Sequence, residues 1–213
     1  QSLLGAVLTV ALLGSNPVLA AADTLEQALR EQRYGAALQF ADAALKERPD
    51  DLRLLTARGL ALGGLQRTEE SLSAFEAVLG TSPAFVPALK GAAQTSYAAR
   101  DRRAVAFLKR LLALDSSDAT AHGMSAVLAF EAGDCASAAA HFEAGRGQTE
   151  ANPQAYAMYG ACLLKLRRAK EAVTVFERLV RADPASSATA RSLASAQAAD
   201  ANPRLAASTL VRA

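Results

Sequence analysis

The sequence predicts an all-α fold in which a pair of antiparallel helices is repeated along the chain, as an α-solenoid. Of the 213 residues, 51% are apolar and only 5% are aromatic, and Ala and Leu, the strongest helix formers, dominate the apolar set. Pro49 and Pro83 are 34 residues apart, and Pro184 follows Pro83 by 101 residues, one short of three such periods. A fixed period of this length is typical of arrays of helix pairs.

Within one period, the apolar residues follow the spacing of two helices. In residues 153–186, Tyr156 and Leu163 are seven positions apart and share one helical face. An Arg-Arg pair then predicts a turn, and Phe176 and Leu179 continue at helical spacing until an Asp-Pro pair ends the second helix. Each period therefore predicts a helix, a short turn and a second helix.

Small residues recur at two places in each period, and a large apolar residue follows the second of them. The small residues of the first helices are Gly59, Ala93, Ala126 and Gly160, and those of the second helices are Ala37, Ser71, Ala104, Ala138 and Ala172. The large residues are Phe75, Leu108, Phe142 and Phe176. With this pattern the chain resembles the tetratricopeptide repeat (TPR) family, whose helix pairs form a right-handed superhelix. The resemblance implies that the small residues let the helices of a pair touch, while the large residue fills the gap to the next pair.

The resemblance divides residues 23–186 into an array of about five repeats. The expected bounds of the repeats are 18–51, 52–85, 86–118, 119–152 and 153–186. The first repeat therefore overlaps the end of the segment that precedes the array. The missing residue of the period falls in the third repeat. In the fourth repeat we expect the second helix to end early, followed by a loop from Gly145 to Asn152. Residues 187–213 are expected to form a capping helix and a tail, and Arg204 to Arg212 is either a further short helix or frayed.

An apolar run of 11 residues, Leu3 to Leu13, lies near the start of the sequence. The run is too short to span a bilayer, and small residues follow it before Asp23, as in a signal peptide cleaved between Ala20 and Asp23. We expect residues 1–22 to be a signal peptide whose basic n-region is missing from this sequence. The mature protein is then periplasmic or secreted, with no stable membrane span. The alternative is that the segment is not cleaved and anchors the chain.

The sequence contains two cysteines, Cys135 and Cys162. The helices predicted around them place both near the boundary between the fourth and fifth repeats. Two alternatives stay open: a disulfide across this boundary, which an oxidising compartment permits, or two separate buried thiols.

No pattern of catalytic, metal-binding or cofactor-binding residues is recognisable. The two histidines are His122, expected to be a partly buried structural residue, and His141, expected to face solvent. Motifs for metal ligation, phosphate binding or a nucleophilic serine are missing. The net charge of +2 comes without a basic face carrying interleaved aromatic residues, which excludes a typical nucleic-acid partner. We therefore expect no enzyme, no cofactor and no nucleic acid.

The resemblance implies that the first helices of the repeats line a concave groove. The residues expected there are Arg53, Thr56, Leu60, Lys90, Gln94, Tyr97, Gly123, Val127, Phe130, Ala157, Ala161 and Leu164. An apolar strip with a polar rim suits an extended or helical peptide, and Arg53 and Lys90 would meet its carboxylates. The alternative is that the curvature of the array or the C-terminal tail covers some of these side chains. Gln94 and Met124 stand where the family members that grip chaperone C-termini have Asn, so that mode is not expected.

The prediction for function is a non-catalytic scaffold or adaptor of the bacterial cell envelope, which binds a partner protein or peptide in this groove. The class follows from the resemblance, since many exported members of the family serve the assembly of envelope machines. A self-associating structural module, and thus a homo-oligomer, is the alternative, and a regulatory subunit of an envelope enzyme is a further one.

Overall fold

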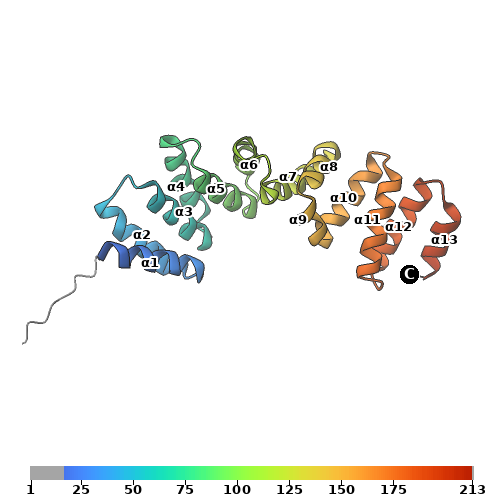
Figure 1. Ribbon diagram of the computed structural model, residues 1–213, viewed down its shortest axis with the longest axis horizontal. Coiled ribbons are helices and arrows are strands. Elements are labelled where there is room, and N and C mark those ends of the chain that lie inside the picture. The colour runs from blue at the N-terminus through green and yellow to red at the C-terminus, as the bar shows by residue number, and fades with distance from the viewer. Residues whose placement is uncertain (1–16, 213) are drawn as a thin grey trace, which may run out of the picture. The chain divides into compact units, whose positions relative to one another are not determined.

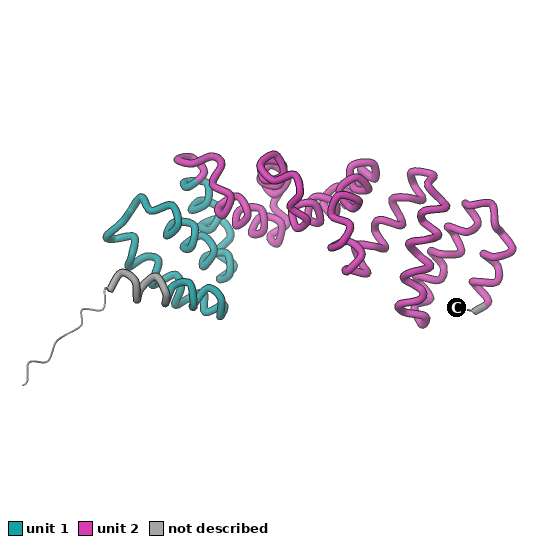
Figure 2. The backbone as a smooth tube through the Cα atoms, viewed as in Figure 1, with its two compact units in different colours: residues 1–78 teal, residues 79–213 magenta. Residues whose placement is uncertain are grey.

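The computed structural model describes residues 17–212, with side chains described over residues 24–211, and that part of the chain contains helices and no strands. The chain divides into two compact units, residues 1–78 and 79–213 (Figure 2). The apolar run of the predicted signal peptide lies outside the described residues. No helix in the described range is both long enough and apolar enough to span a bilayer.

The described part of unit 1, residues 17–78, contains three complete helices and most of a fourth (Figure 1). They are α1 (Pro17–Arg30), α2 (Tyr34–Glu47), α3 (Leu52–Gly64) and α4 (Thr68–Thr81), which crosses the unit boundary. The segment from Ala20 to Asp23, where cleavage is expected, lies within α1. The Asp51 carboxylate begins α3 by accepting the backbone N–H groups of Arg53 and Leu54, at 2.9 and 3.2 Å.

Unit 2 contains the remaining nine helices of the described chain. They are α5 (Val86–Ala98), α6 (Arg103–Leu114), α7 (Ala119–Glu131), α8 (Cys135–Ala144), α9 (Arg146–Ala151), α10 (Pro153–Lys165), α11 (Ala169–Ala182), α12 (Ser187–Ala199) and α13 (Pro203–Arg212). Successive helices form hairpins, α5 with α6, α7 with α8, α10 with α11, and α12 with α13 (Figure 1).

Every helix pair turns through the same backbone motif. One residue per turn has a left-handed backbone, with φ between 55° and 79°: Gln32, Gln66, Arg100, Gly133, Arg167 and Ala201. The next residue donates its N–H to a carbonyl five residues back, which closes the end of the first helix. These turns recur every 34 residues, except for 33 between Arg100 and Gly133, as the proline spacing predicts. The last turn, at Ala201, shows that residues 187–212 form a sixth pair, so α13 is a helix and not a frayed tail.

A glycine in the first helix of a pair accommodates a phenylalanine ring from the second. A Cβ atom built on Gly59 would lie 2.7 Å from the Phe75 ring, and one on Gly160 would lie 2.7 Å from the Phe176 ring. The large residue therefore packs first against the small residue of its own pair. Phe176 also belongs to the core cluster that includes Leu193 of α12, so it contributes to the contact with the next pair as well.

The fourth repeat differs from the expectation after its second helix. α8 ends early, at Ala144, as predicted, but the predicted loop is wrong because residues 146–151 form the short helix α9. Thr149 explains the difference. Its buried hydroxyl donates to the backbone carbonyls of Phe142 and Gly145, at 3.0 and 3.2 Å. Phe142 lies in the last turn of α8, and the carbonyl of Gly145, the residue that caps α8, also accepts the backbone N–H of Thr149 at 3.0 Å.

Candidate functional site

Two adjoining hollows lie along α5 and α7 in unit 2. The first, of about 160 Å³, is lined by Tyr97, Thr120, Gly123, Met124, Val127, Gln148, Thr149, Asn152 and Ala155. The second, of about 80 Å³, is lined by Lys90, Gln94, Leu111, Asp118, Thr120, Ala121 and Met124. Because Thr120 and Met124 line both, we treat the two hollows as one site and call it the α5–α7 groove.

Five residues expected in a groove meet here, from two successive first helices. Lys90, Gln94 and Tyr97 come from α5, and Gly123 and Val127 come from α7. Their spacing of three or four residues places them on one face of each helix. Two of the first helices expected to line a groove, α5 and α7, thus line these hollows together with residues of α6 and α9.

The remaining expected residues of unit 2 pack against the core. Phe130 is half-buried against the cluster around Ala126 and Phe142. Ala157 and Leu164 of α10 lie against the cluster that extends to α12, and Ala161 is half-buried on the same helix. Neighbouring helices cover much of these side chains, which is the alternative weighed for them.

The three expected residues of unit 1 lie on α3. Arg53 is exposed, and Leu60 has 37% of its surface exposed. Thr56 is wrong as a ligand-binding residue, because it is buried and its hydroxyl donates to the Leu52 carbonyl at 2.6 Å. The donor of this hydroxyl is used within its own helix, and burial keeps its oxygen from a partner.

The charge of Lys90 is already matched within the groove. Its Nζ lies 2.7 Å from the Asp118 carboxylate, which also accepts the N–H of Ala121 at the start of α7. Burial raises the pKa of Asp118, but the ammonium of Lys90 and the backbone N–H bonds outweigh it, so the net pKa is lowered. The hydrogen bond to Asp118 raises the pKa of Lys90. A ligand carboxylate must therefore compete with Asp118 for Lys90, contrary to the expectation that Lys90 would meet it directly.

The other polar groups of the groove are mainly neutral. Tyr97 is half-buried, and burial followed by the charge of Glu131 raises the pKa of its phenol, which stays protonated. The Asn152 side-chain oxygen accepts the N–H groups of Gln154 and Ala155 at the start of α10, at 3.0 and 3.2 Å. Asn152 therefore presents its amide nitrogen as a donor. Gln94 and Gln148 add further amide groups.

Several residues that line the groove were not among those expected there, including Thr120, Gln148 and Asn152. Thr120 lies three residues before Gly123, so the helical spacing used for the other groove residues was sufficient to find it. Gln148 lies on α9, which was expected to be a loop, and no local pattern in the sequence places it beside α7.

A separate apolar hollow of about 470 Å³ lies where α6, α7 and α8 meet. It is lined by Val105, Leu108, Lys109, Leu112, Ser125, Leu128, Ala129, Ala132, Asp134, Ser137 and His141. The α7 residues that line it are different from those that line the α5–α7 groove. The sequence analysis did not predict this hollow.

The two histidines are brought together although they lie 19 positions apart. The Nδ1 atoms of His122 and His141 are 2.9 Å apart, and both residues are half-buried. His122 is partly buried as expected, but the expectation that His141 faces solvent is wrong, because it packs against His122. Burial lowers the pKa of His141, and the neighbouring His122 lowers it further.

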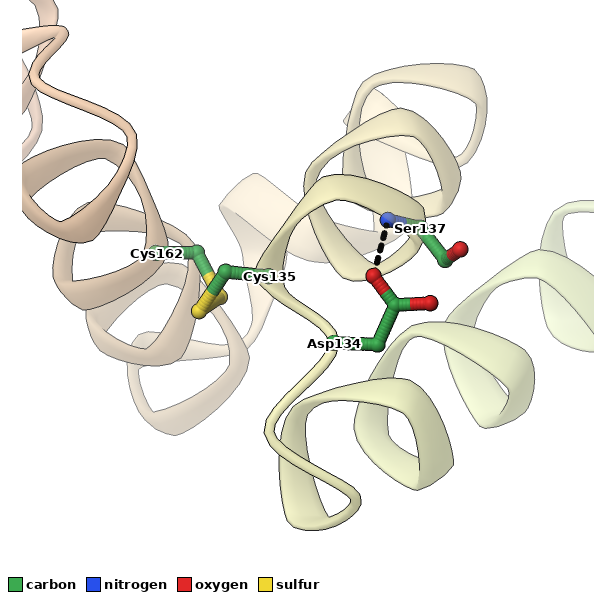
Figure 3. Close-up of a disulfide and its surroundings, with 4 residues drawn as sticks. All are labelled: Asp134, Cys135, Ser137 and Cys162. Carbon is green, nitrogen blue, oxygen red and sulfur yellow. Dashed lines mark hydrogen bonds between the residues drawn. A yellow bond between two sulfur atoms is a disulfide. The ribbon is translucent and has the colours of Figure 1, made fainter.

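A disulfide joins Cys135, the first residue of α8, to Cys162 of α10 (Figure 3). The two Cα atoms are 4.9 Å apart and both residues are buried. Figure 3 also shows how α8 begins: the Asp134 carboxylate accepts the backbone N–H of Ser137 at 3.0 Å. The disulfide therefore ties the fourth helix pair to the fifth.

The comparisons with known proteins agree with this architecture. Residues 129–196 match the tetratricopeptide repeat family. No curated protein sequence matches the chain.

Several solved structures have the same fold. YrrB, described as a TPR protein with an unusual peptide-binding site, is 16% identical, with a TM-score of 0.72 over 81% of this chain and 89% of that one. A TPR protein from Parabacteroides merdae is 14% identical, with a TM-score of 0.65 over 90% of this chain and 76% of that one. MamA is 17% identical, with a TM-score of 0.63 over 74% and 89%.

At these identities the likeness concerns the fold. The family match, the six identical turns and the shared fold lead to one conclusion. The described chain has the α-solenoid fold of tetratricopeptide repeat proteins, and residues 129–196 match that family.

Proposed function

We propose that this protein is a non-catalytic scaffold that binds an extended segment of a partner protein in the α5–α7 groove. The fold is one that generally serves protein–protein interaction. The observation that carries the proposal is the convergence of Tyr97, Val127 and Met124 with the amides of Gln94, Gln148 and Asn152 around two adjoining hollows.

The size of the hollows favours a peptide over a small-molecule cofactor. Sites for small molecules enclose roughly 300–1,000 Å³, whereas these hollows measure about 160 and 80 Å³. Two small adjoining hollows suit successive side chains of an extended chain, whose backbone the amide groups can hydrogen-bond. The fold shared with YrrB, described as having a peptide-binding site, supports the same class of ligand.

The chemistry of the groove favours an uncharged segment. Lys90 is paired with Asp118, and the other polar groups are amides, a phenol and hydroxyls. We therefore expect apolar side chains in the partner to contact Tyr97, Met124 and Val127. A carboxylate in the partner would add little affinity, since it must displace Asp118 from Lys90.

We also propose that the protein acts in the bacterial cell envelope after export. The disulfide between Cys135 and Cys162 supports an oxidising compartment. If a signal peptidase cuts between Ala20 and Asp23, the mature chain begins inside α1. Alkylation of the protein isolated from envelope without reduction should modify neither cysteine, whereas modification of both at full yield would contradict this location.

The groove is tested by capture of a partner from envelope extract. Wild type should retain a partner that a Tyr97→Ala, Val127→Ser double variant loses, because both side chains line the first hollow. The matched control is Leu114→Ser, an exposed residue at the end of α6 that lines neither the groove nor the apolar hollow, 49% of whose surface is accessible. Each variant must keep the helical circular dichroism of wild type. Equal retention of the partner by all three proteins would disprove the groove.

The alternative is self-association, and one surface favours it. On α13, the last helix, Leu205, Leu210 and Val211 are 42%, 52% and 87% exposed. Exposed apolar side chains of this kind could pack against a helix pair of a second copy. Light scattering distinguishes the two functions: a concentration-dependent dimer that Leu210→Ser abolishes would support self-association, and a monomer at all concentrations would exclude it.

A further inference from the structure

The contact between His122 and His141 depends on a close approach of α7 and the end of α8. Gly145 ends α8, and a Cβ atom built on it would lie 3.2 Å from Cβ of His122 and 3.3 Å from the Ala119 carbonyl. The short helix and its glycine therefore bring the two backbones together at this point. The result is an Nδ1–Nδ1 distance of 2.9 Å between the two imidazoles.

The hydrogen bonds determine where the protons lie in the neutral pair. Nε2 of His122 is 3.0 Å from the carbonyl oxygen of Ser116. A carbonyl only accepts, so Nε2 of His122 carries the proton and its Nδ1 carries a lone pair. The 2.9 Å contact is then the Nδ1–H of His141 donating to Nδ1 of His122.

We propose that His122 and His141 form a two-imidazole site for a divalent transition-metal ion of the Ni²⁺ or Cu²⁺ class, which joins α7 to α8. The ion takes the place of the shared hydrogen. The proton on Nδ1 of His141 moves through solvent to Nε2 of the same ring, so both Nδ1 atoms donate lone pairs. The neutral pair releases no proton in this step.

The spacing of the two nitrogens favours that class of ion. Two nitrogen ligands at about 2.0–2.1 Å and at right angles are about 2.8–3.0 Å apart, and tetrahedral ligands are about 3.3 Å apart. The observed 2.9 Å matches the right-angle arrangement found in tetragonal and octahedral sites. The Ser116 carbonyl orients the His122 ring through Nε2, as second partners of metal-binding histidines commonly do.

The surroundings leave the site open to solvent. Both histidines are half-buried, so water molecules can complete the coordination. Over the described part of the chain, no group of three or more His, Cys, Asp or Glu residues is arranged to hold a metal. Asp134 and Lys109 line the apolar hollow beside His141. The proposed site therefore has two protein ligands and is separate from the α5–α7 groove.

The sequence contains only these two histidines, so no other imidazole can bind the ion in the test. Untagged, disulfide-intact protein is titrated with Ni²⁺ by calorimetry, alongside His122→Gln, His141→Gln and the double variant. Wild type should bind one equivalent. Each single variant should lose affinity by about tenfold or more, the range found for weaker perturbations of metal sites, and Ni²⁺ should raise the melting temperature of wild type alone.

Two results would overturn the proposal. Equal affinity in wild type and a single variant would show that the imidazoles do not act as a pair, and undiminished binding by the double variant would place the ion elsewhere. A measurement on wild type covers the case in which a variant misfolds. One equivalent of Ni²⁺ should broaden the imidazole NMR signals of both rings together, and broadening of one ring alone, or of neither, would contradict the site.

Discussion

Two neighbouring helix pairs of unit 2, α7 with α8 and α10 with α11, show how one repeat plan is kept or modified. α11 runs for 14 residues, whereas α8 stops after 10. In the α10–α11 pair, Gly160 accommodates the ring of Phe176. In the α7–α8 pair, the glycine at a close contact lies just after the end of the second helix instead. There, Gly145 lets the two backbones approach each other beside His122.

The shortened helix creates surfaces that the regular pair lacks. After Gly145 the chain forms α9, which Thr149 holds against the end of α8, and α9 adds Gln148 to the α5–α7 groove. In the same helix pair, Nδ1 of His122 lies 2.9 Å from Nδ1 of His141. The comparison teaches that a local departure from the repeat adds a side chain, Gln148, to a groove whose other expected residues follow the regular spacing.

The largest expected effect comes from separating the two pairs. Replacing both Cys135 and Cys162 by Ala removes a cross-link between residues 27 positions apart. The free energy of unfolding should fall by about 3–4 kcal/mol, because the unfolded chain regains the entropy of an open loop. Urea unfolding followed by circular dichroism measures the loss.

Reduction provides the control for the disulfide. A thiol reductant should destabilise wild type by the same amount and should leave the double variant unchanged. A loss below about 1 kcal/mol would show that the cross-link contributes little to holding the two pairs together.

The two glycines should respond differently to an added methyl group. Gly160→Ala should destabilise by about 1–2 kcal/mol, because overpacking against Phe176 and Val175 exceeds the gain in helix propensity. Gly145→Ala should cost less, since its nearest contacts are 3.2–3.3 Å away and its φ is −93°. Gly80→Ala, with open space around the new methyl, should stabilise by up to about 1 kcal/mol. Thermal melts give all three values, and a larger loss at Gly145 than at Gly160 would reverse the comparison.

A smaller effect is expected from the hydroxyl that holds α9. Thr149→Val removes the donor to the Phe142 and Gly145 carbonyls and should cost about 1 kcal/mol. The matched change in the regular pair is Thr174→Val, whose exposed hydroxyl donates to Lys170 at 3.3 Å, and it should stay within about 0.5 kcal/mol. Hydrogen exchange of the α9 amides should rise in the first variant only. Equal costs would mean that Thr149 does not determine α9.

Much of the architecture follows from local patterns in the sequence. The spacing of the prolines gives the length of the repeat. The small residues mark the points where two helices touch, because close packing of helices leaves no room for a large side chain there. The groove residues of α5 follow from the same spacing, and Lys90, Gln94 and Tyr97 lie where it places them.

The remainder depends on contacts between residues distant in sequence. α9 is six residues long and is held by one buried threonine, which carries no periodic signal. The pairing of His122 with His141 joins residues of α7 and α8 that are 19 positions apart, and the pairing of Lys90 with Asp118 joins α5 to the start of α7. Thr56 fits the groove spacing on α3 but is buried. Helical spacing alone does not show which of the residues on one side of a helix are exposed to solvent.

Site-specific photo-crosslinking tests the central claim, that the α5–α7 groove binds a partner, most directly. Benzoylphenylalanine is placed at Gln94, in the groove, or at Lys109, in the apolar hollow beside His141. Illumination in the envelope should yield a cross-linked partner from position 94 and none from position 109. A partner captured from position 109 alone would contradict the account and move the binding surface to the hollow between α6, α7 and α8.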